Sequence, residues 1–267
     1  MTHILAVANQ KGGVGKTTTS MNLAASLVTM KQKTLLVDLD QQSNASVGLG
    51  VELSEETGTV WEILVDNGNP MDMILPTSCG VDVIPSNSDL TSAELQMLGE
   101  RDRNFRLQRA FSQVNGYDYI ILDCPPALNV VTINALMAAT GVIIPMQCEY
   151  FALEGLSGLI RTLDAVRAAG HRNLELDGIL RCMYDPRNSL TNDVARQLFQ
   201  YFPEQVYRTV IPRNVRLAEA PSHGLAVIEY SPKCRGALAY LALANEVIRR
   251  HEAHESDSVD VTETGDS

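Results

Sequence analysis

The residues best suited to chemistry lie near the start of the chain, in residues 11–18, where the order is Lys-Gly-Gly-Val-Gly-Lys-Thr-Thr. Glycines let backbone N–H groups turn inward around phosphate oxygens, because they adopt conformations that other residues avoid. In such a loop a lysine reaches the β- and γ-phosphates of a nucleotide, and the hydroxyl after it binds Mg²⁺. The spacing therefore predicts a site for a nucleotide and Mg²⁺, formed by Lys11, Gly12, Gly13, Val14, Gly15, Lys16, Thr17 and Thr18.

The segments on either side of this loop are of the kinds that it requires. An apolar, strand-like run at residues 4–8 precedes it, and a helix-like pattern at residues 22–27 follows it. The N-terminus of such a helix directs its positive dipole end at the phosphates. The loop departs from the generic pattern G-x-x-x-x-G-K-[ST], because Gln10 stands at the first position and Lys11 adds a second lysine.

Two other strand-like segments end in carboxylates. Residues 119–122 lead into Asp123, at the edge where ligands bind in open α/β sheets, so we predict that Asp123 holds Mg²⁺ through a water. Asp38 and Asp40 follow the strand-like residues 34–37, and both face the phosphates if the chain turns after Leu39. The alternative for either acid is a loop carboxylate that caps the next turn.

Strand-like and helical patterns alternate along most of the chain, as a parallel sheet with crossover helices requires. The sequence predicts an α/β fold with a doubly wound, mostly parallel sheet flanked by helices. We expect one ATPase domain over residues 1–250, closed by a helix at residues 236–250. Residues 251–267 are predicted to be an acidic, disordered tail.

The composition limits the possible partners. The net charge of −11 argues against a surface that is basic all round and binds nucleic acid everywhere. Residues 205–250 are an exception, because they contain seven basic residues and only three acidic ones. No apolar run reaches the roughly 20 residues that span a bilayer. The five cysteines have no C-x-x-C spacing, so we expect reduced thiols and a cytoplasmic protein without a signal peptide or a membrane partner.

The second lysine gives the loop the form K-G-G-x-G-K-[ST], and residues 211–224 read I-P-R-N-V-R-L-A-E-A-P-S-H-G. In these features the chain resembles the ParA/Soj group of the deviant Walker A (ParA/MinD) ATPases, which partition chromosomes and plasmids. The resemblance extends over residues 1–250. It implies a P-loop ATPase whose turnover is weak alone and is stimulated by a partner.

The resemblance implies catalytic roles for Lys11, Lys16 and Asp40. Lys11 would reach across an ATP-bound homodimer to the partner's phosphates, much as an arginine finger does. Asp40 matches an acid of the family segment D-x-D-P-Q-G-N, where it would orient the attacking water. The metal site implied by the resemblance consists of Thr17, Asp40 and Asp123.

The resemblance also covers the region around the nucleotide base and marks two departures from the family. Pro212 and Asn214 would border the adenine. The chain has Gln41 where the family usually has proline and Ser43 where it has glycine, so we expect a different turnover rate.

A DNA-binding face is implied by the same family. On this chain the face would consist of Arg187, Arg216, Lys233 and Arg235. These residues would bind double-stranded DNA of any sequence by contacting the charged phosphates of its backbone. Such a protein would be nucleoid-associated and would respond to a ParB/Spo0J-type activator. A structural salt bridge with Glu219 is the alternative for Arg216.

Three other functions fit the sequence less well, and a fourth cannot be distinguished from partitioning by any residue. A MinD-like membrane-cycling ATPase needs a basic amphipathic C-terminal helix, whereas this C-terminus is acidic. An iron–sulfur reductase needs cysteines from both subunits, and neither Cys124 nor Cys148 has a clear counterpart. A scaffold that never turns nucleotide over is disfavoured by the intact Lys11, Lys16, Asp40 and Asp123. An orphan ParA-like ATPase that positions another cargo stays open, because no residue discriminates it.

Overall fold

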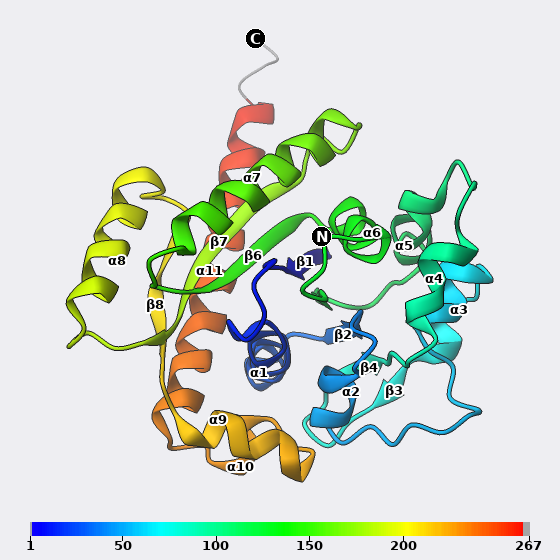
Figure 1. The fold of residues 1–267 in the computed structure, drawn as a ribbon, viewed down its shortest axis with the longest axis horizontal. Coiled ribbons are helices and arrows are strands. Elements are labelled where there is room, and N and C mark those ends of the chain that lie inside the picture. Colours follow the sequence, from blue (N-terminus) through cyan, green and yellow to red (C-terminus); the bar gives the residue numbers. More distant parts are fainter. Residues whose placement is uncertain (1, 264–267) are drawn as a thin grey trace.

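A single sheet forms the centre of the molecule. The computed structural model describes residues 2–263, and within them the strands form one eight-stranded sheet in the order β3-β4-β2-β5-β1-β6-β7-β8 (Figure 1). Neighbouring strands in this range pair in parallel except β3 and β4, which are antiparallel at one edge. The predicted mostly parallel sheet is therefore confirmed. The strands are β1 (His3–Val7), β2 (Thr34–Asp38), β3 (Leu75–Pro76), β4 (Asp82–Ile84), β5 (Tyr119–Asp123), β6 (Gly141–Gln147), β7 (Glu175–Tyr184) and β8 (Val206–Pro212).

Helices cover both faces of the sheet, so the predicted doubly wound arrangement is also confirmed (Figure 1). Alternate residues of one strand enter different cores, since side chains alternate across a strand. Leu5 and Val7 pack with α1 and α11, whereas Ala6 packs with α6 and α7. The helices are α1 (Lys16–Thr29), α2 (Asn44–Gly48), α3 (Val60–Val65), α4 (Leu90–Gln96), α5 (Arg106–Phe111), α6 (Val130–Ala138), α7 (Ala152–Ala168), α8 (Ser189–Tyr201), α9 (Val215–Glu219), α10 (Val227–Tyr230) and α11 (Arg235–Glu263), with short 3₁₀ turns η1 (Pro70–Met73), η2 (Arg103–Phe105) and η3 (Ala220–His223).

The strands that carry the predicted site are buried along their full length. Every residue of β2 and of β5 is buried, as expected for strands covered on both faces, which read as continuous apolar runs. Because these strands and β1 run parallel, the loops after Val7, Asp38 and Asp123 meet at one edge of the sheet. The carboxyl edge of the sheet therefore gathers three segments that are far apart in sequence.

The last helix is longer than the sequence predicts. The predicted helix ends at Arg250, but α11 continues to Glu263. The reason lies at its middle, where His251 is buried and its Nε2 lies 2.5 Å from Asp177 Oδ2 of β7. This contact holds the helix against the sheet past the predicted end. Residues 264–267 of the predicted tail lie outside the described residues, and the division into an ATPase domain and a tail stays a prediction.

Candidate functional site

The glycine loop lies between β1 and α1 in the conformation that its glycines permit. Gly13 and Gly15 have φ of 70° and 99°, in the left-handed region that other residues avoid. An added Cβ at Gly12 or Gly13 would meet no protein atom within 4 Å, so the loop fronts open space. Gly15 provides no side-chain cap for α1, which leaves backbone N–H groups of the first turn available for an anion. The loop is therefore shaped for phosphate.

Lys16 is buried at the start of α1, and only 7% of its surface is exposed. Its Nζ donates a hydrogen bond to the backbone oxygen of Lys11, 3.1 Å away, within the same loop. Burial lowers the pKa of Lys16, and the nearby carboxylate of Asp123 opposes this shift. The ammonium group thus lies inside the loop, beside the acid at the end of β5.

Asp123 has one oxygen that is satisfied and one that is not. Ser20 Oγ donates to Asp123 Oδ1 at 2.8 Å, whereas the buried Oδ2 has no hydrogen-bond partner among the described residues. Burial, with a smaller contribution from the neighbouring Asp38, raises the pKa of Asp123 to about 7. The hydroxyl of Thr17 lies close enough to lower this pKa slightly. An orphaned buried carboxylate oxygen beside a hydroxyl fits a Mg²⁺ site that water and phosphate complete.

Asp38 organises the loop after β2. Its Oδ2 accepts hydrogen bonds from the backbone N and the Oγ of Ser46, at 2.9 and 2.7 Å, and its Oδ1 accepts from the backbone N of Asp40 at 3.1 Å. Burial raises the pKa of Asp38 to about 6, against these hydrogen bonds. The contacts of Asp38 are therefore those of a loop carboxylate that caps the next turn, which the sequence left open as the alternative to a position facing the phosphates.

Asp40 is less buried and its geometry differs from that of Asp38. Its Oδ1 accepts from the backbone N of Gln42 at 3.1 Å, and its charge acts on Lys16 and Asp123.

The two residues that depart from the family, Ser43 and Gln41, each form a side-chain hydrogen bond. Ser43 has a φ of 54°, which favours glycine, and its Oγ donates to Ser86 O at 2.8 Å, while Gln41 accepts from Thr91 at 2.6 Å.

A cavity of about 360 Å³ adjoins the P-loop at Gly15 and Thr18, beside the end of β8. It contains both predicted base-site residues, Pro212 and Asn214, and Asn214 also caps α9 through the backbone N of Arg216 at 2.9 Å. This volume and its largely apolar lining suit a nucleotide base. Further wall residues, which had not been predicted from the sequence, come from β7, α9 and α11: Cys182, Met183, Val215, Leu217, Ala218 and Tyr240.

Lys11 lies at the exposed start of the loop, away from this cavity. Its Nζ lies 2.5 Å from Glu149 Oε2 of the same chain, and about half of each side chain is exposed. Glu149 was not identified from the sequence, because it lies far from the loop along the chain and belongs to no recognisable motif.

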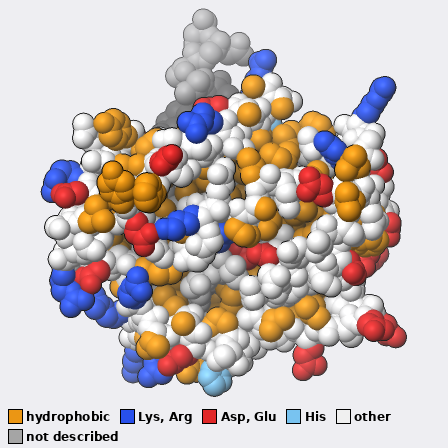
Figure 2. All heavy atoms as spheres, viewed as in Figure 1, with side chains coloured by type: hydrophobic (Ala, Val, Ile, Leu, Met, Phe, Trp, Pro, Cys, Tyr) orange, Lys and Arg blue, Asp and Glu red, His pale blue; other side chains and the backbone are white. Residues whose placement is uncertain are grey.

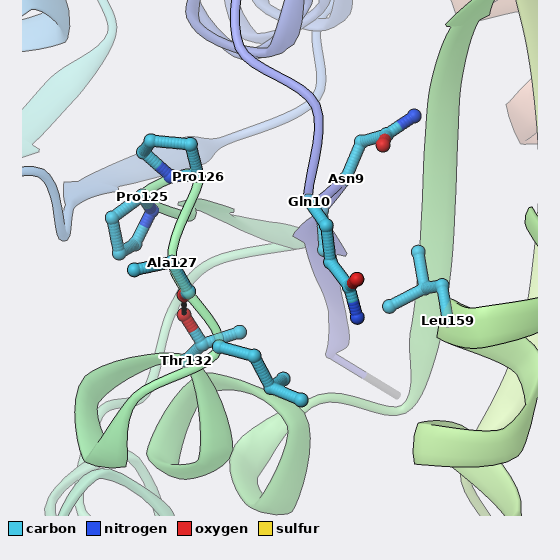
Figure 3. Close-up of a pocket in the computed structure, with 9 residues that line it drawn as sticks. Asn9, Gln10, Pro125, Pro126, Ala127, Thr132 and Leu159 are labelled. Carbon is cyan, nitrogen blue, oxygen red and sulfur yellow. Dashed lines mark hydrogen bonds between the residues drawn. The ribbon is translucent and has the colours of Figure 1, made fainter. Parts of the chain in front are cut away.

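The loop after β5 lies beside the start of the P-loop without closing on it. Figure 3 shows Pro125, Pro126 and Ala127 on one side of a small pocket and Gln10 on the other. Thr132 Oγ1 of α6 donates to Ala127 O at 2.6 Å, and this bond fixes the loop. The pocket measures about 10 Å³, enough for one water at most.

The predicted DNA-binding residues lie on the surface in two neighbouring places. Arg216 of α9 pairs with Glu219 at 2.6 Å, and Leu217 packs against Gly236 near the start of α11, which places Arg216 near Lys233 and Arg235. Arg187, 88% exposed, pairs with Asp185 in the loop after β7. Figure 2 shows basic side chains gathered at the lower left, over the β7–α8 loop and the α9–α11 region.

Other kinds of site find no support among the described residues. There, no group of three or more His, Cys, Asp and Glu side chains could hold a metal alone, and Cys124 and Cys148 are buried. No helix in residues 2–263 is long and apolar enough to cross a membrane.

The chain is similar to known proteins over most of its length. The AAA domain family matches residues 2–176. A chromosome-partitioning ATPase, Soj, from Thermus thermophilus is 48% identical over 246 residues, which cover 92% of this chain and 95% of that protein. The chromosome partitioning protein ParA of Caulobacter vibrioides is 46% identical over 251 residues, 92% of this chain and 94% of ParA.

A solved structure gives the same result for the fold. Cobyrinic acid a,c-diamide synthase from Mycobacterium smegmatis, with bound ADP and magnesium, is 35% identical and superposes with a TM-score of 0.83. The match covers 95% of this chain and 97% of that one.

Proposed function

This chain belongs to the ParA/Soj family of chromosome-partitioning ATPases, and we propose that it works as an ATP-driven, DNA-binding dimer. It hydrolyses ATP to ADP and phosphate. In the proposed cycle the ATP-bound homodimer binds double-stranded DNA without sequence preference, and hydrolysis releases it. A ParB/Spo0J-type partner would stimulate that hydrolysis, and the protein would be cytoplasmic and nucleoid-associated.

Each part of the proposed ATP site has a physical role. The loop N–H groups and Lys16 hold the phosphates, and the 360 Å³ cavity at Pro212 and Asn214 receives the base. Thr17 and Asp123 would hold Mg²⁺, which neutralises phosphate charge when bound. Asp40 accepts a hydrogen bond from the attacking water and so orients it for attack, since an ordinary carboxylate is a weak base toward water.

Dimerisation is supported by what surrounds Lys11. Tyr150 and Phe151 follow Glu149 directly, and they are 75% and 72% exposed. Large exposed aromatic side chains are typical of protein interfaces. A second copy on this face would cover them and would bring its own Lys11 near the first copy's phosphates.

The observation that carries the DNA-binding proposal is the position of α9. Its N-cap Asn214 and its first residue Val215 line the cavity for the base, while Arg216, one residue on, is half exposed. Nucleotide binding therefore acts on the element that presents the basic surface. Contacts of Arg216, Lys233 and Arg235 with phosphates would make binding sensitive to salt.

The test is binding to nonspecific duplex DNA with ATP, with ADP and without nucleotide. We expect binding with ATP alone, and a loss of at least about tenfold for Arg216→Glu, because a phosphate contact becomes a repulsion. Arg109→Glu is the matched control, since Arg109 is also an ion-paired surface arginine, 55% exposed, but lies on α5. Equal affinities of the two variants would remove Arg216 from the interface, and binding without nucleotide would contradict the cycle.

An orphan ATPase that positions another cargo remains the second candidate. Both candidates share the ATP site and the DNA-binding face. An adjacent gene for a ParB-like protein, and stimulation of turnover by its product, would favour partitioning.

A further inference from the structure

The end of β6 and the loop that leads to α7, residues 147–151, contact the P-loop at two points. Gln147 Nε2 donates to Gly13 O at 3.0 Å, and Glu149 Oε2 lies 2.5 Å from Lys11 Nζ. Both contacts are made by one segment to the loop that must receive the phosphates.

Lys11 is held through its backbone as well as its side chain. Its N–H donates to Asn9 Oδ1 at 3.0 Å, and its carbonyl accepts from Lys16 Nζ at 3.1 Å. Phosphate is a stronger acceptor for an ammonium group than a neutral carbonyl. When ATP binds, Lys16 Nζ would therefore leave the Lys11 carbonyl for a phosphate oxygen. The ion pair with Glu149 would then be the contact that still holds the Lys11 side chain.

We propose that Glu149 is a positioning residue that retains Lys11 within its own subunit until a second ATP-bound subunit arrives. The inference rests on the proposed function, in which Lys11 acts on the partner's ATP. In the single subunit, the ammonium group of Lys11 forms an ion pair with the carboxylate of Glu149. In the dimer the γ-phosphate of the partner's ATP replaces the Glu149 carboxylate.

The exposure of the pair makes it suitable for exchange. The two side chains are 54% and 49% exposed, and solvent-exposed ion pairs of this kind contribute little to stability. Such a pair shifts an equilibrium by about two- to fivefold. Because a dimer must break two such pairs, the effect on the dimer association constant is the square of this factor, about four- to twenty-fivefold.

The test compares wild type with Glu149→Gln in ATP-dependent dimerisation, measured by sedimentation at low salt with a nonhydrolysable ATP analogue and Mg²⁺. Glu149→Gln keeps the size of the side chain and removes its charge, so we expect it to dimerise about four- to twenty-fivefold more tightly. Glu154→Gln is the matched control, because Glu154 is an exposed acid in the first turn of α7. An equal or weaker association for Glu149→Gln would overturn the proposal.

Two further measurements show whether Glu149 acts through Lys11. The effect of Glu149→Gln should vanish in a Lys11→Ala background, as a double-mutant cycle requires, and the same gain in that background would overturn the proposal. In the wild-type background the difference should shrink as salt rises from about 0.05 to about 0.5 M, because the pair is screened. A difference that persists at high salt would assign Glu149 a nonionic structural role, even if Lys11→Ala cannot dimerise.

Failure of the proposed function would give a different result. Lys11→Ala with normal ATP-dependent dimerisation and normal turnover would remove Lys11 from the partner's site. If Lys11→Ala loses turnover while Glu149→Gln associates like wild type, the partner's lysine stands and only the retention by Glu149 fails.

Discussion

Asp123 is buried, and the side chain of Asp177 is only 8% exposed. Both belong to strands of the same sheet, but they lie at opposite edges and their pKa values are shifted in opposite directions. Asp123 ends β5 at the carboxyl edge, where burial raises its pKa to about 7. Asp177 lies near the start of β7. Burial acts to raise its pKa too, but His251, Tyr207 and Arg250 together outweigh it, so the pKa falls below its usual value.

The difference follows from the partners available at each edge. At the amino edge Asp177 accepts from Tyr207 and from His251, while His251 stacks on the ring of His3 with centroids 4.1 Å apart. Arg250 adds a hydrogen bond to the backbone oxygen of Asp177. At the carboxyl edge Asp123 Oδ2 has no such partner among the described residues. A buried acid with complete partners stabilises the fold, whereas one left incomplete marks where a ligand binds.

The largest effect should come from replacing Asp177 by asparagine, with the same replacement at Asp123 as the comparison. Asp177→Asn removes the charge that His251, Tyr207 and Arg250 surround, so we expect the free energy of unfolding to fall by about 2–4 kcal/mol. Asp123→Asn relieves a buried carboxylate near Asp38, so without nucleotide we expect a change within about 1 kcal/mol, or a gain. Urea unfolding at pH 7.5 measures both. Equal losses would abolish the distinction between the two edges.

Nucleotide should act on one edge only. At a concentration 100 times its Kd, a nonhydrolysable ATP analogue with Mg²⁺ should stabilise wild type by about 2.7 kcal/mol. Asp177→Asn should gain the same increment, because its edge is remote from the ligand, whereas Lys16→Ala should gain little. Lys33→Ala, which removes an exposed lysine before β2, is the matched control for Lys16→Ala. A full gain in Lys16→Ala would place the phosphates elsewhere.

The carboxyl edge could be predicted largely from sequence because its chemistry is local. Residues 11–18 are contiguous, and Asp123 follows an apolar strand, so spacing alone placed both near phosphate. The structure brings them together as the sequence predicts. The resemblance to the family added Pro212 and Asn214, and both line the cavity beside Gly15.

Contacts between distant segments could not be predicted. Glu149 is an ordinary acid in sequence, and only the folded chain places it against Lys11. The same holds for Tyr240, which reaches the cavity from α11, and for the order of the strands. The end of α11 was misplaced because residues after Arg250 look polar, whereas the burial of His251 against Asp177 depends on β7.

The smallest expected effect is a pH dependence of opposite sign at the two edges. Burial, and repulsion by His251, lower the pKa of His3, with Glu255 opposing the shift. The unfolded chain then binds a proton at His3 more readily than the folded chain, so this group lowers stability as the pH falls below about 6.5. Asp123 acts in reverse, because its raised pKa makes the folded chain hold the extra proton, and its contribution is lost as the pH rises from about 4 to about 7.

Urea unfolding between pH 5 and 8 separates these two contributions. His3→Gln should make the free energy of unfolding rise less steeply with pH than in wild type, and Asp123→Asn should make it rise more steeply, since each variant removes one of two opposing slopes. Parallel profiles for both variants and wild type would mean that neither group titrates differently on folding. In that case the incomplete partners of Asp123, rather than its pKa, would be the sole feature that distinguishes the nucleotide edge from the amino edge.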